Sequence, residues 1–354
     1  MPSSRRPRVP CVPTREVIAM SEALDPLAPG DAVKLYLDHR EGELSSETLQ
    51  SHRYRLEAFT EWCEKNGIHN LNDLSGRKLH SYRVDRREED DLKPITLQGQ
   101  LSTLRVFLKF CVSIDAVPES LPEKILLPTV SDGEQASRTT LEADRADRIL
   151  DHLEKFQYAS RDHVLLTLLW NTGIRMGSAR ALDIEDYDRD SPGIQLVHRP
   201  ETDTPLKNQE RGERWVALRG ETATIIEDYI DGPRIDTTDD YGRNPLFSTS
   251  QGRASRSCIR SAIYTLTRPC QYVECPHGRD PETCEAMDRP HASTCPSSRS
   301  PHDIRSGAIT AHLLDDVPIE IVSDRMNVSQ QILDQHYDRR TEREKMEQRR
   351  KYLR

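Results

Sequence analysis

The chain of 354 residues has no run of about twenty apolar residues, and no basic start followed by an apolar stretch marks a signal peptide. Segments of those kinds span a bilayer or direct secretion. We therefore expect a soluble, cytoplasmic protein without a membrane partner. Disulfides belong mainly to secreted proteins, so the eight cysteines need a different interpretation.

Lysine and aromatic residues are also scarce. Only ten of the 50 basic residues are lysines, aromatic residues make up 5% of the chain, and the formal net charge is -9. This acidic balance argues against a nucleic-acid partner, because phosphate binding usually requires a basic surface. Basic residues nevertheless cluster locally, at 5–8, 83–87 and 339–354. An acidic, lysine-poor chain is typical of proteins from a salt-rich cytosol. There the excess carboxylates keep the protein surface hydrated, while local basic surfaces remain available.

Helical periodicity dominates residues 24–130, after a segment at 1–23 that is rich in Pro, Ser and Arg and predicts a disordered arm. Apolar residues recur at helical spacing from Leu49 to Cys63 and again from Leu97 to Cys111. This pattern predicts a domain of about four helices, in which the cysteine that ends each stripe is a small core residue. Residues 131–139 have almost no apolar content and predict a linker.

Residues 140–354 predict a second domain. Two short segments, 194–198 and 214–218, favour strands of a small antiparallel sheet. The remaining periodic segments favour helices near 141–156, 161–171, 221–230, 255–267, 302–314 and 318–326. The predicted fold class is therefore mainly α, with a helical N-terminal domain and a mostly helical C-terminal domain.

Four basic residues and one tyrosine of the second domain stand out: Arg175, Lys207, His302, Arg305 and Tyr337. Two arginines can grip a phosphate, a histidine and a lysine can move protons, and a tyrosine can attack phosphorus. Each has an ordinary alternative, as a helix-capping arginine, a surface salt-bridging pair or a half-buried helix tyrosine. Together they are the parts needed to cut and rejoin a DNA strand, and they occur in one order, with the arginines 130 residues apart and the tyrosine 32 residues later.

Lys207 is the only lysine between Lys155 and Lys345. A guanidinium does not release its proton, so a solitary lysine in an arginine-rich chain suggests proton transfer. The alternative is an ordinary surface charge in the turn between the two predicted strands.

The contexts Asn-Thr-Gly-Ile-Arg175, Pro-Leu-Lys207, Pro-His-Asp-Ile-Arg305 and Gln-His-Tyr337 resemble those of the tyrosine recombinase (phage integrase) family, and Xer-like site-specific recombinases in particular. The resemblance covers about residues 24–354. It implies that the N-terminal domain is a core-binding (SAM-like) domain, which clamps the duplex opposite a catalytic domain. The partner would be double-stranded DNA, on which a homotetramer assembles.

The resemblance also implies a mechanism that needs no cofactor. Tyr337 would attack the scissile phosphate and form a 3'-phosphotyrosyl link, while Arg175 and Arg305 neutralise the developing charge. His302 would help to deprotonate or orient, and Lys207 would protonate the leaving 5'-oxygen.

DNA contacts are expected on the N-terminal domain at Lys93, Thr96, Gln98 and Arg105. The alternative is that these side chains form only the solvated face of an amphipathic helix.

Three positions depart from the family pattern. Ser178 stands where an acidic residue is usual, three positions after the first arginine. Val328 replaces a His or Trp nine residues before the tyrosine, and so cannot donate a hydrogen bond. Asn327 replaces a glycine, which is compatible with a left-handed backbone because asparagine tolerates that conformation.

A cysteine-rich insertion at 268–300 precedes the His302 helix, and it contains Cys270, Cys275, Cys284 and Cys295. It has few apolar residues, so a structural zinc ion held by four thiolates could fold it. His277 or His291 could substitute for one cysteine. Disulfides and free thiols are the alternatives.

Three functions fit these observations. The first is a site-specific recombinase or integrase of a mobile element. The second is a type IB topoisomerase-like enzyme, which shares the chemistry but acts without a partner site. The third is a DNA-binding protein that has the fold without the activity.

Overall fold

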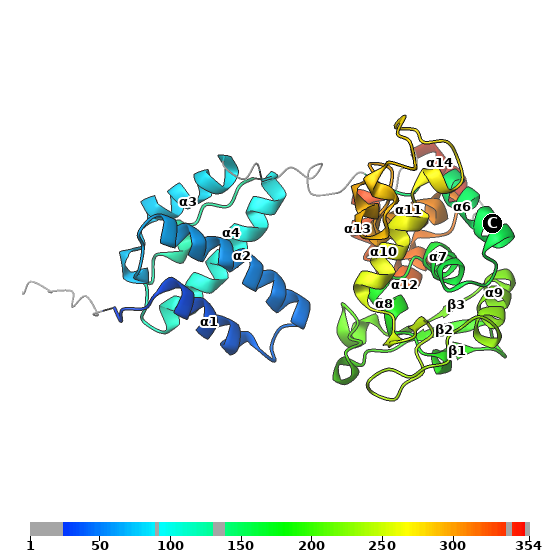
Figure 1. Cartoon of the computed structure of the whole chain (residues 1–354), viewed down its shortest axis with the longest axis horizontal. Coiled ribbons are helices and arrows are strands. Elements are labelled where there is room, and N and C mark those ends of the chain that lie inside the picture. Colours follow the sequence, from blue (N-terminus) through cyan, green and yellow to red (C-terminus); the bar gives the residue numbers. More distant parts are fainter. Residues whose placement is uncertain (1–23, 89–91, 130–138, 338–341, 351–354) are drawn as a thin grey trace, which may run out of the picture. The chain divides into compact units, whose positions relative to one another are not determined.

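The computed structural model describes residues 24–88, 92–129, 139–337 and 342–350 (Figure 1). The chain divides into two compact units, Met1–Ala136 and Ser137–Arg354. Helices dominate both units, which confirms the predicted fold class. The predicted arm and nearly all of the predicted linker lie outside the described residues. Within the described ranges, no helix has both the length and the apolar content to cross a membrane.

The described part of the N-terminal unit contains four α-helices, as predicted. They are α1 (Pro29–Arg40), α2 (Ser46–Lys65), α3 (Gly76–Glu88) and α4 (Pro94–Ser113). Helix α2 begins where the Ser45 hydroxyl accepts a hydrogen bond from the Thr48 amide. The chain turns away after α2 at Gly67, whose φ of +64° suits glycine.

The core of this unit is built from the apolar stripes of α2 and α4. Phe59 and Phe107 are fully buried, and their rings pack edge to face at 6.2 Å between centroids. Cys63 and Cys111 are fully buried, and burial raises the pKa of each thiol to about 12. Both cysteines are therefore unreactive core residues, as the helical spacing predicted.

The C-terminal unit has nine α-helices and five short strands within its described residues. The helices are α6 (Ala143–Phe156), α7 (Arg161–Thr172), α8 (Met176–Ala181), α9 (Gly220–Asp231), α10 (Arg256–Leu266), α11 (Pro301–Leu314), α12 (Ile319–Met326), α13 (Gln330–His336) and α14 (Glu342–Arg350), together with short 3-10 turns. The strands are β1 (Tyr187–Asp188), β2 (Gly193–Leu196), β3 (Arg214–Ala217), β4 (Ser248–Thr249) and β5 (Gly252–Arg253). Strands β1, β2 and β3 form one antiparallel sheet in that order, and β4 pairs with β5.

Helix α7 is the centre of the C-terminal unit and is buried along almost its whole length. It packs against α6, α8, α9, α10 and α11 (Figure 1). Gly307 lets α11 approach closely, because a Cβ there would lie 2.9 Å from the Trp170 ring and closer still to the Leu141 carbonyl oxygen. The first turn of α11 is fixed by a capping box between Ser300 and Asp303. These contacts hold the N-terminal end of α11, which carries His302 and Arg305.

Candidate active site

A cavity of about 460 Å³ opens in the C-terminal unit, and all five of the predicted catalytic residues line it. Its lining residues are Arg175, Met176, Gly177, Lys207, Arg260, Tyr264, Ser300, Pro301, His302, Arg305, Val328, Ile332 and Tyr337. These residues come from segments that are up to 162 positions apart in the chain, from Arg175 to Tyr337. The fold therefore brings the separate sequence motifs together in one place.

The two arginines are oriented by main-chain carbonyl groups. Gly173 ends α7 in the left-handed conformation, with φ +59°, and Arg175 follows as the N-cap of α8. The Arg175 guanidinium donates to the Asn327 carbonyl oxygen at 3.2 Å. Arg305 donates to the carbonyl oxygens of Gly173 at 2.5 Å and Met326 at 2.8 Å. One turn, at the end of α12, therefore holds both guanidinium groups.

The two arginines carry positive charge in a partly desolvated site. Burial, together with the nearby charge of Arg175, lowers the pKa of Arg305 to about 9. Burial also lowers the pKa of Arg175. Among the described residues, neither forms an ion pair with a carboxylate. A bound phosphate would supply the missing negative charge.

Arg214, at the start of β3, is a third arginine of this cluster that sequence reasoning missed. Burial lowers its pKa to about 10, and the Arg175 charge contributes. It donates to the carbonyl oxygens of Arg325 and Gly212, at 2.8 Å each. Arg214 is the first residue of a predicted strand, and nothing in its local sequence indicates that it lies near the catalytic arginines.

Lys207 lies in the connection between β2 and β3, as predicted, and its side chain is exposed. The preceding residue, Leu206, is buried, and its amide donates to the Nδ1 atom of His198 at 2.9 Å. This anchor fixes one side of the loop and leaves the lysine directed to the cavity that it lines.

His302 lies in the first turn of α11. Its pKa is lowered by desolvation, and the positive charges of Arg305, Lys207 and Arg175 add to this effect, against the opposing charge of Asp303. The imidazole is therefore neutral at neutral pH and has a lone pair free to accept a proton.

Tyr337 ends α13, where its amide donates to the Leu333 carbonyl oxygen at 2.9 Å. The half-buried ring packs against a small apolar cluster that includes Leu313 and Met326. Tyr337 lines the same cavity as Arg175 and Arg305, and a charge on its phenol would raise the pKa of both arginines.

The positions that depart from the family pattern have distinct surroundings. Val328 lines the cavity, where it can donate no hydrogen bond. Asn327 adopts the left-handed conformation, with φ +50°, as predicted. Its side chain contacts Asn208 and Arg211. Ser178 is buried in α8.

Two further lining residues, Arg260 and Tyr264 of α10, were also not predicted. They lie one turn apart on the same helix, and both reach the cavity. Their helix was predicted from its apolar periodicity, but periodicity does not tell which polar side chains face a cavity that other segments complete.

The predicted DNA contacts of the N-terminal unit fall into two groups. Gln98 donates to the Pro128 carbonyl oxygen at 3.2 Å, and Arg105 donates to the Ile125 carbonyl oxygen. These two side chains therefore hold the segment after α4 against the helix. Lys93 and Thr96 are exposed at the start of α4. For all four residues, a role in binding DNA stays a prediction.

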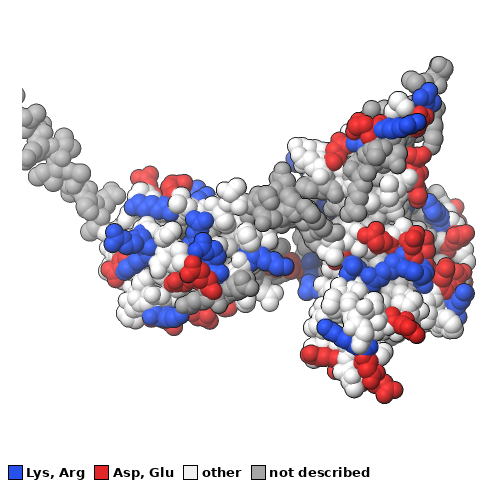
Figure 2. Space-filling view, turned by 90° about the horizontal axis from the view of Figure 1, so that it is seen from above, with Lys and Arg blue, Asp and Glu red and all other residues white. Residues whose placement is uncertain are grey.

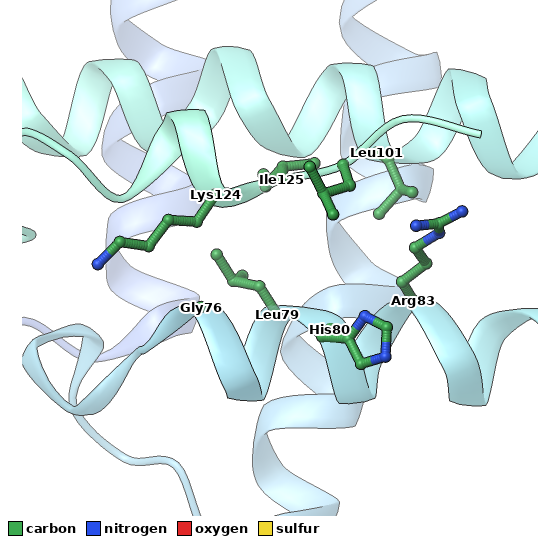
Figure 3. Close-up of a pocket in the computed structure, with 8 residues that line it drawn as sticks. Gly76, Leu79, His80, Arg83, Leu101, Lys124 and Ile125 are labelled. Atoms are coloured by element: carbon green, nitrogen blue, oxygen red, sulfur yellow. The ribbon is translucent and has the colours of Figure 1, made fainter. Parts of the chain in front are cut away.

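The N-terminal unit has its own cavity of about 270 Å³, between α3 and the segment after α4 (Figure 3). Apolar side chains such as Leu79, Leu101 and Ile125 form its middle, with His80, Arg83 and Lys124 around them. Its lining contains no hydroxyl, thiol or carboxylate group. The cavity around Tyr337 is therefore the better candidate for chemistry.

The zinc site expected in the insertion is not supported. Among the described residues, no three His, Cys, Asp or Glu side chains form a group that could hold a metal ion. Cys270, Cys275, Cys284 and Cys295 are free thiols.

Two arginines hold the main chain of the insertion and the residue before it. Arg268 is buried and donates to the Ala286 carbonyl oxygen. Arg145 of α6 donates to the carbonyl oxygens of Thr267 and Ser297. Hydrogen bonds of this kind cannot be read from the sequence, and a zinc ion in the insertion stays a prediction.

Comparisons with known proteins agree with these features. Residues 33–113 match the family model described as phage integrase, N-terminal SAM-like domain. Tyrosine recombinase XerC of Pseudomonas syringae pv. syringae is 27% identical over 197 residues, which cover 54% of this chain and 64% of that protein. The chain thus spans just under two thirds of the length of this curated relative. The N-terminal domain of a phage integrase/site-specific recombinase from Haloarcula marismortui is 39% identical, covering 29% of this chain and 99% of that chain with a TM-score of 0.29.

Two solved structures share the fold over most of the chain. The Tn1549 transposon integrase in complex with a circular intermediate DNA has a TM-score of 0.67 at 14% identity, covering 92% of this chain and 100% of that chain. A lambda integrase dimer bound to a COC' core site has a TM-score of 0.60 at 11% identity. The match covers 90% of this chain and 79% of that chain. The sequence matches and the shared fold lead to one conclusion: the chain belongs to the tyrosine recombinase (phage integrase) family.

Proposed function

We propose that the protein is a site-specific DNA recombinase that cuts and rejoins strands through a 3'-phosphotyrosyl intermediate. The observation that carries this proposal is the shared cavity of Arg175, Lys207, His302, Arg305 and Tyr337. Family membership supports it, because members of this family break and rejoin DNA.

The chemistry follows from the groups at the cavity. The Tyr337 oxygen attacks the scissile phosphorus as its proton passes to the neutral His302, and the bond from phosphorus to the 5'-oxygen breaks. Lys207 gives a proton to that 5'-oxygen. Arg175 and Arg305 stabilise the charge that develops on the non-bridging oxygens. A 5'-hydroxyl from a second strand then reverses the attack and rejoins the DNA.

Double-stranded DNA is the proposed substrate, and the N-terminal unit is its proposed clamp. Helix α3 carries five basic side chains against two acidic ones. Figure 2 shows Lys and Arg side chains gathered on the face of this unit that is in view. A local basic surface of this kind can bind phosphates although the whole chain is acidic. On DNA we propose that four copies assemble, with the exchange of strands between two duplexes.

Strand exchange tests this function against the topoisomerase alternative. Purified protein is incubated with two duplexes that carry the target site, and separately with supercoiled plasmid that lacks it. A recombinase yields joined products from the duplexes and does not relax the plasmid. Relaxation of any supercoiled DNA without exchange would instead favour a type IB topoisomerase-like activity.

A further inference from the structure

The turn between α12 and α13 contains an asparagine in a conformation that glycine adopts without strain. Asn327 has φ +50° and ψ +63°, and its amide donates to the Asp324 and Ser323 carbonyl oxygens. Glycine would satisfy these backbone contacts equally well. What asparagine adds at this position is a side chain with one donor group and one acceptor.

Both ends of that side chain bind the loop between β2 and β3. The Asn327 Oδ1 atom accepts a hydrogen bond from Asn208 Nδ2 at 2.6 Å. The Asn327 Nδ2 group donates to the Arg211 carbonyl oxygen at 2.7 Å. Asn208 directly follows Lys207, so the two bonds fix the half of the loop that lies after the lysine.

The same turn orients the arginines through its main chain. The Asn327 carbonyl oxygen accepts from Arg175, and the Met326 carbonyl oxygen accepts from Arg305. The turn therefore contacts the phosphate-binding groups through its backbone and the proton-donating loop through the Asn327 side chain.

Resting on the function proposed above, we propose that Asn327 is a positioning residue that fastens the Lys207 loop to the turn holding the two arginines. The exposed lysine then sits at a fixed place relative to the phosphate that the arginines bind. Without the two bonds, Leu206 anchors only the preceding side of the loop, and Lys207 spends less time at the leaving oxygen.

The test uses the leaving group. A DNA substrate with a 5'-bridging sulfur in place of the 5'-oxygen leaves as a thiolate, which needs no proton because thiols are far more acidic than alcohols. A defect that acts through Lys207 therefore disappears on the sulfur substrate, whereas a defect in phosphate binding persists.

Asn327→Gly is the main variant, since glycine keeps the backbone conformation and removes only the side chain. We expect single-turnover cleavage of the ordinary substrate to slow about tenfold, as two hydrogen bonds are lost. On the sulfur substrate this variant and the wild type should cleave within about twofold of each other. Lys207→Ala should show the same pattern with a larger defect, and Arg175→Ala should be slow on both substrates.

Asn208→Ala provides an independent check, because it removes one of the two bonds from the loop side. Its defect should be smaller than that of Asn327→Gly, and the double variant should be no slower than Asn327→Gly alone. Equal slowing of Asn327→Gly on both substrates, or no slowing on either, would overturn the proposal. If Lys207→Ala is not rescued by sulfur, or the wild type cleaves neither substrate, the function proposed for the cavity fails as well.

Discussion

Arg305 donates a hydrogen bond to the carbonyl oxygen of Gly173, two residues before Arg175, so the two arginine motifs are joined directly although 130 residues separate them. This contact makes the orientation of one arginine depend on the backbone that leads to the other. It also gives Gly173 a role that its sequence context, as a helix stop, does not reveal.

Gly173→Ala should weaken both folding and cleavage. A Cβ there would lie 2.7 Å from the Met326 sulfur, in a backbone with φ +59°. We expect the free energy of unfolding to fall by about 1–2 kcal/mol, from the cost of the left-handed backbone. Displacement of the carbonyl that orients Arg305 should slow cleavage by up to about 100-fold.

Gly220→Ala, at the start of α9 and outside the cavity lining, is the matched control, because a Cβ there meets no atom within 4 Å. Its Tm should equal or exceed that of the wild type, since alanine favours helix. Thermal melts and single-turnover cleavage measure both variants. Equal behaviour of the two would refute the role given to Gly173.

Val328→His should accelerate cleavage. Valine lines the cavity without a hydrogen-bond donor, and a histidine there can donate to a phosphate oxygen. One added contact of about 1 kcal/mol corresponds to roughly a fivefold gain in the single-turnover rate. Val328→Leu, which adds bulk but no donor, separates this effect from packing. A rate unchanged by histidine would mean that the phosphate lies beyond its reach.

The pH dependence of cleavage should show the lowered pKa of His302. Because the pKa lies below its ordinary value of 6.5, the imidazole stays neutral and able to accept a proton down to pH values below 6.5. We expect no loss of rate from this group between pH 8 and 6.5, and a decline only at lower pH. In His302→Gln that decline should vanish from the rate profile. A decline centred above pH 6.5 in the wild type would contradict the assignment.

Arg268→Ala should loosen the insertion at 268–300. Its guanidinium is buried and bound to the Ala286 carbonyl oxygen, which would lose its partner at a cost of about 1–3 kcal/mol. Limited proteolysis should cut the insertion faster, while Arg289→Ala, an exposed site in the same segment, should not change the pattern.

Metal analysis accompanies this experiment. If arginines hold the insertion, chelation leaves the proteolysis pattern of the wild type unchanged. One zinc ion per chain, with unfolding of the insertion on chelation, would restore the four-thiolate site expected from the sequence.

Apolar periodicity predicted the core of the N-terminal unit, and motif order predicted the residues of the candidate active site. The stripes ending at Cys63 and Cys111 are core, and Arg175, Lys207, His302, Arg305 and Tyr337 share a cavity, because helical spacing and motif spacing are properties of the chain itself.

The remainder depended on contacts between distant segments. Arg260 and Tyr264 line the cavity only because other elements complete it. Arg214 does not line it, but its charge helps to lower the pKa of Arg305. Arg105 bonds to the Ile125 carbonyl oxygen of its own unit, a contact that the sequence did not predict, and its role on DNA stays a prediction. A hydrogen bond to a carbonyl oxygen 20 residues away cannot be predicted from the sequence, because every residue has such an oxygen.

The most direct measurement is the mapping of a covalent adduct. The protein is incubated with a nicked target duplex whose short 5'-fragment diffuses away after cleavage, and the trapped species is digested and sequenced by mass spectrometry. The account predicts a phosphodiester-linked nucleotide on Tyr337, and no adduct from Tyr337→Phe, which should still bind the duplex. An adduct on Tyr264 or on any other residue, or one that persists in Tyr337→Phe, would contradict it.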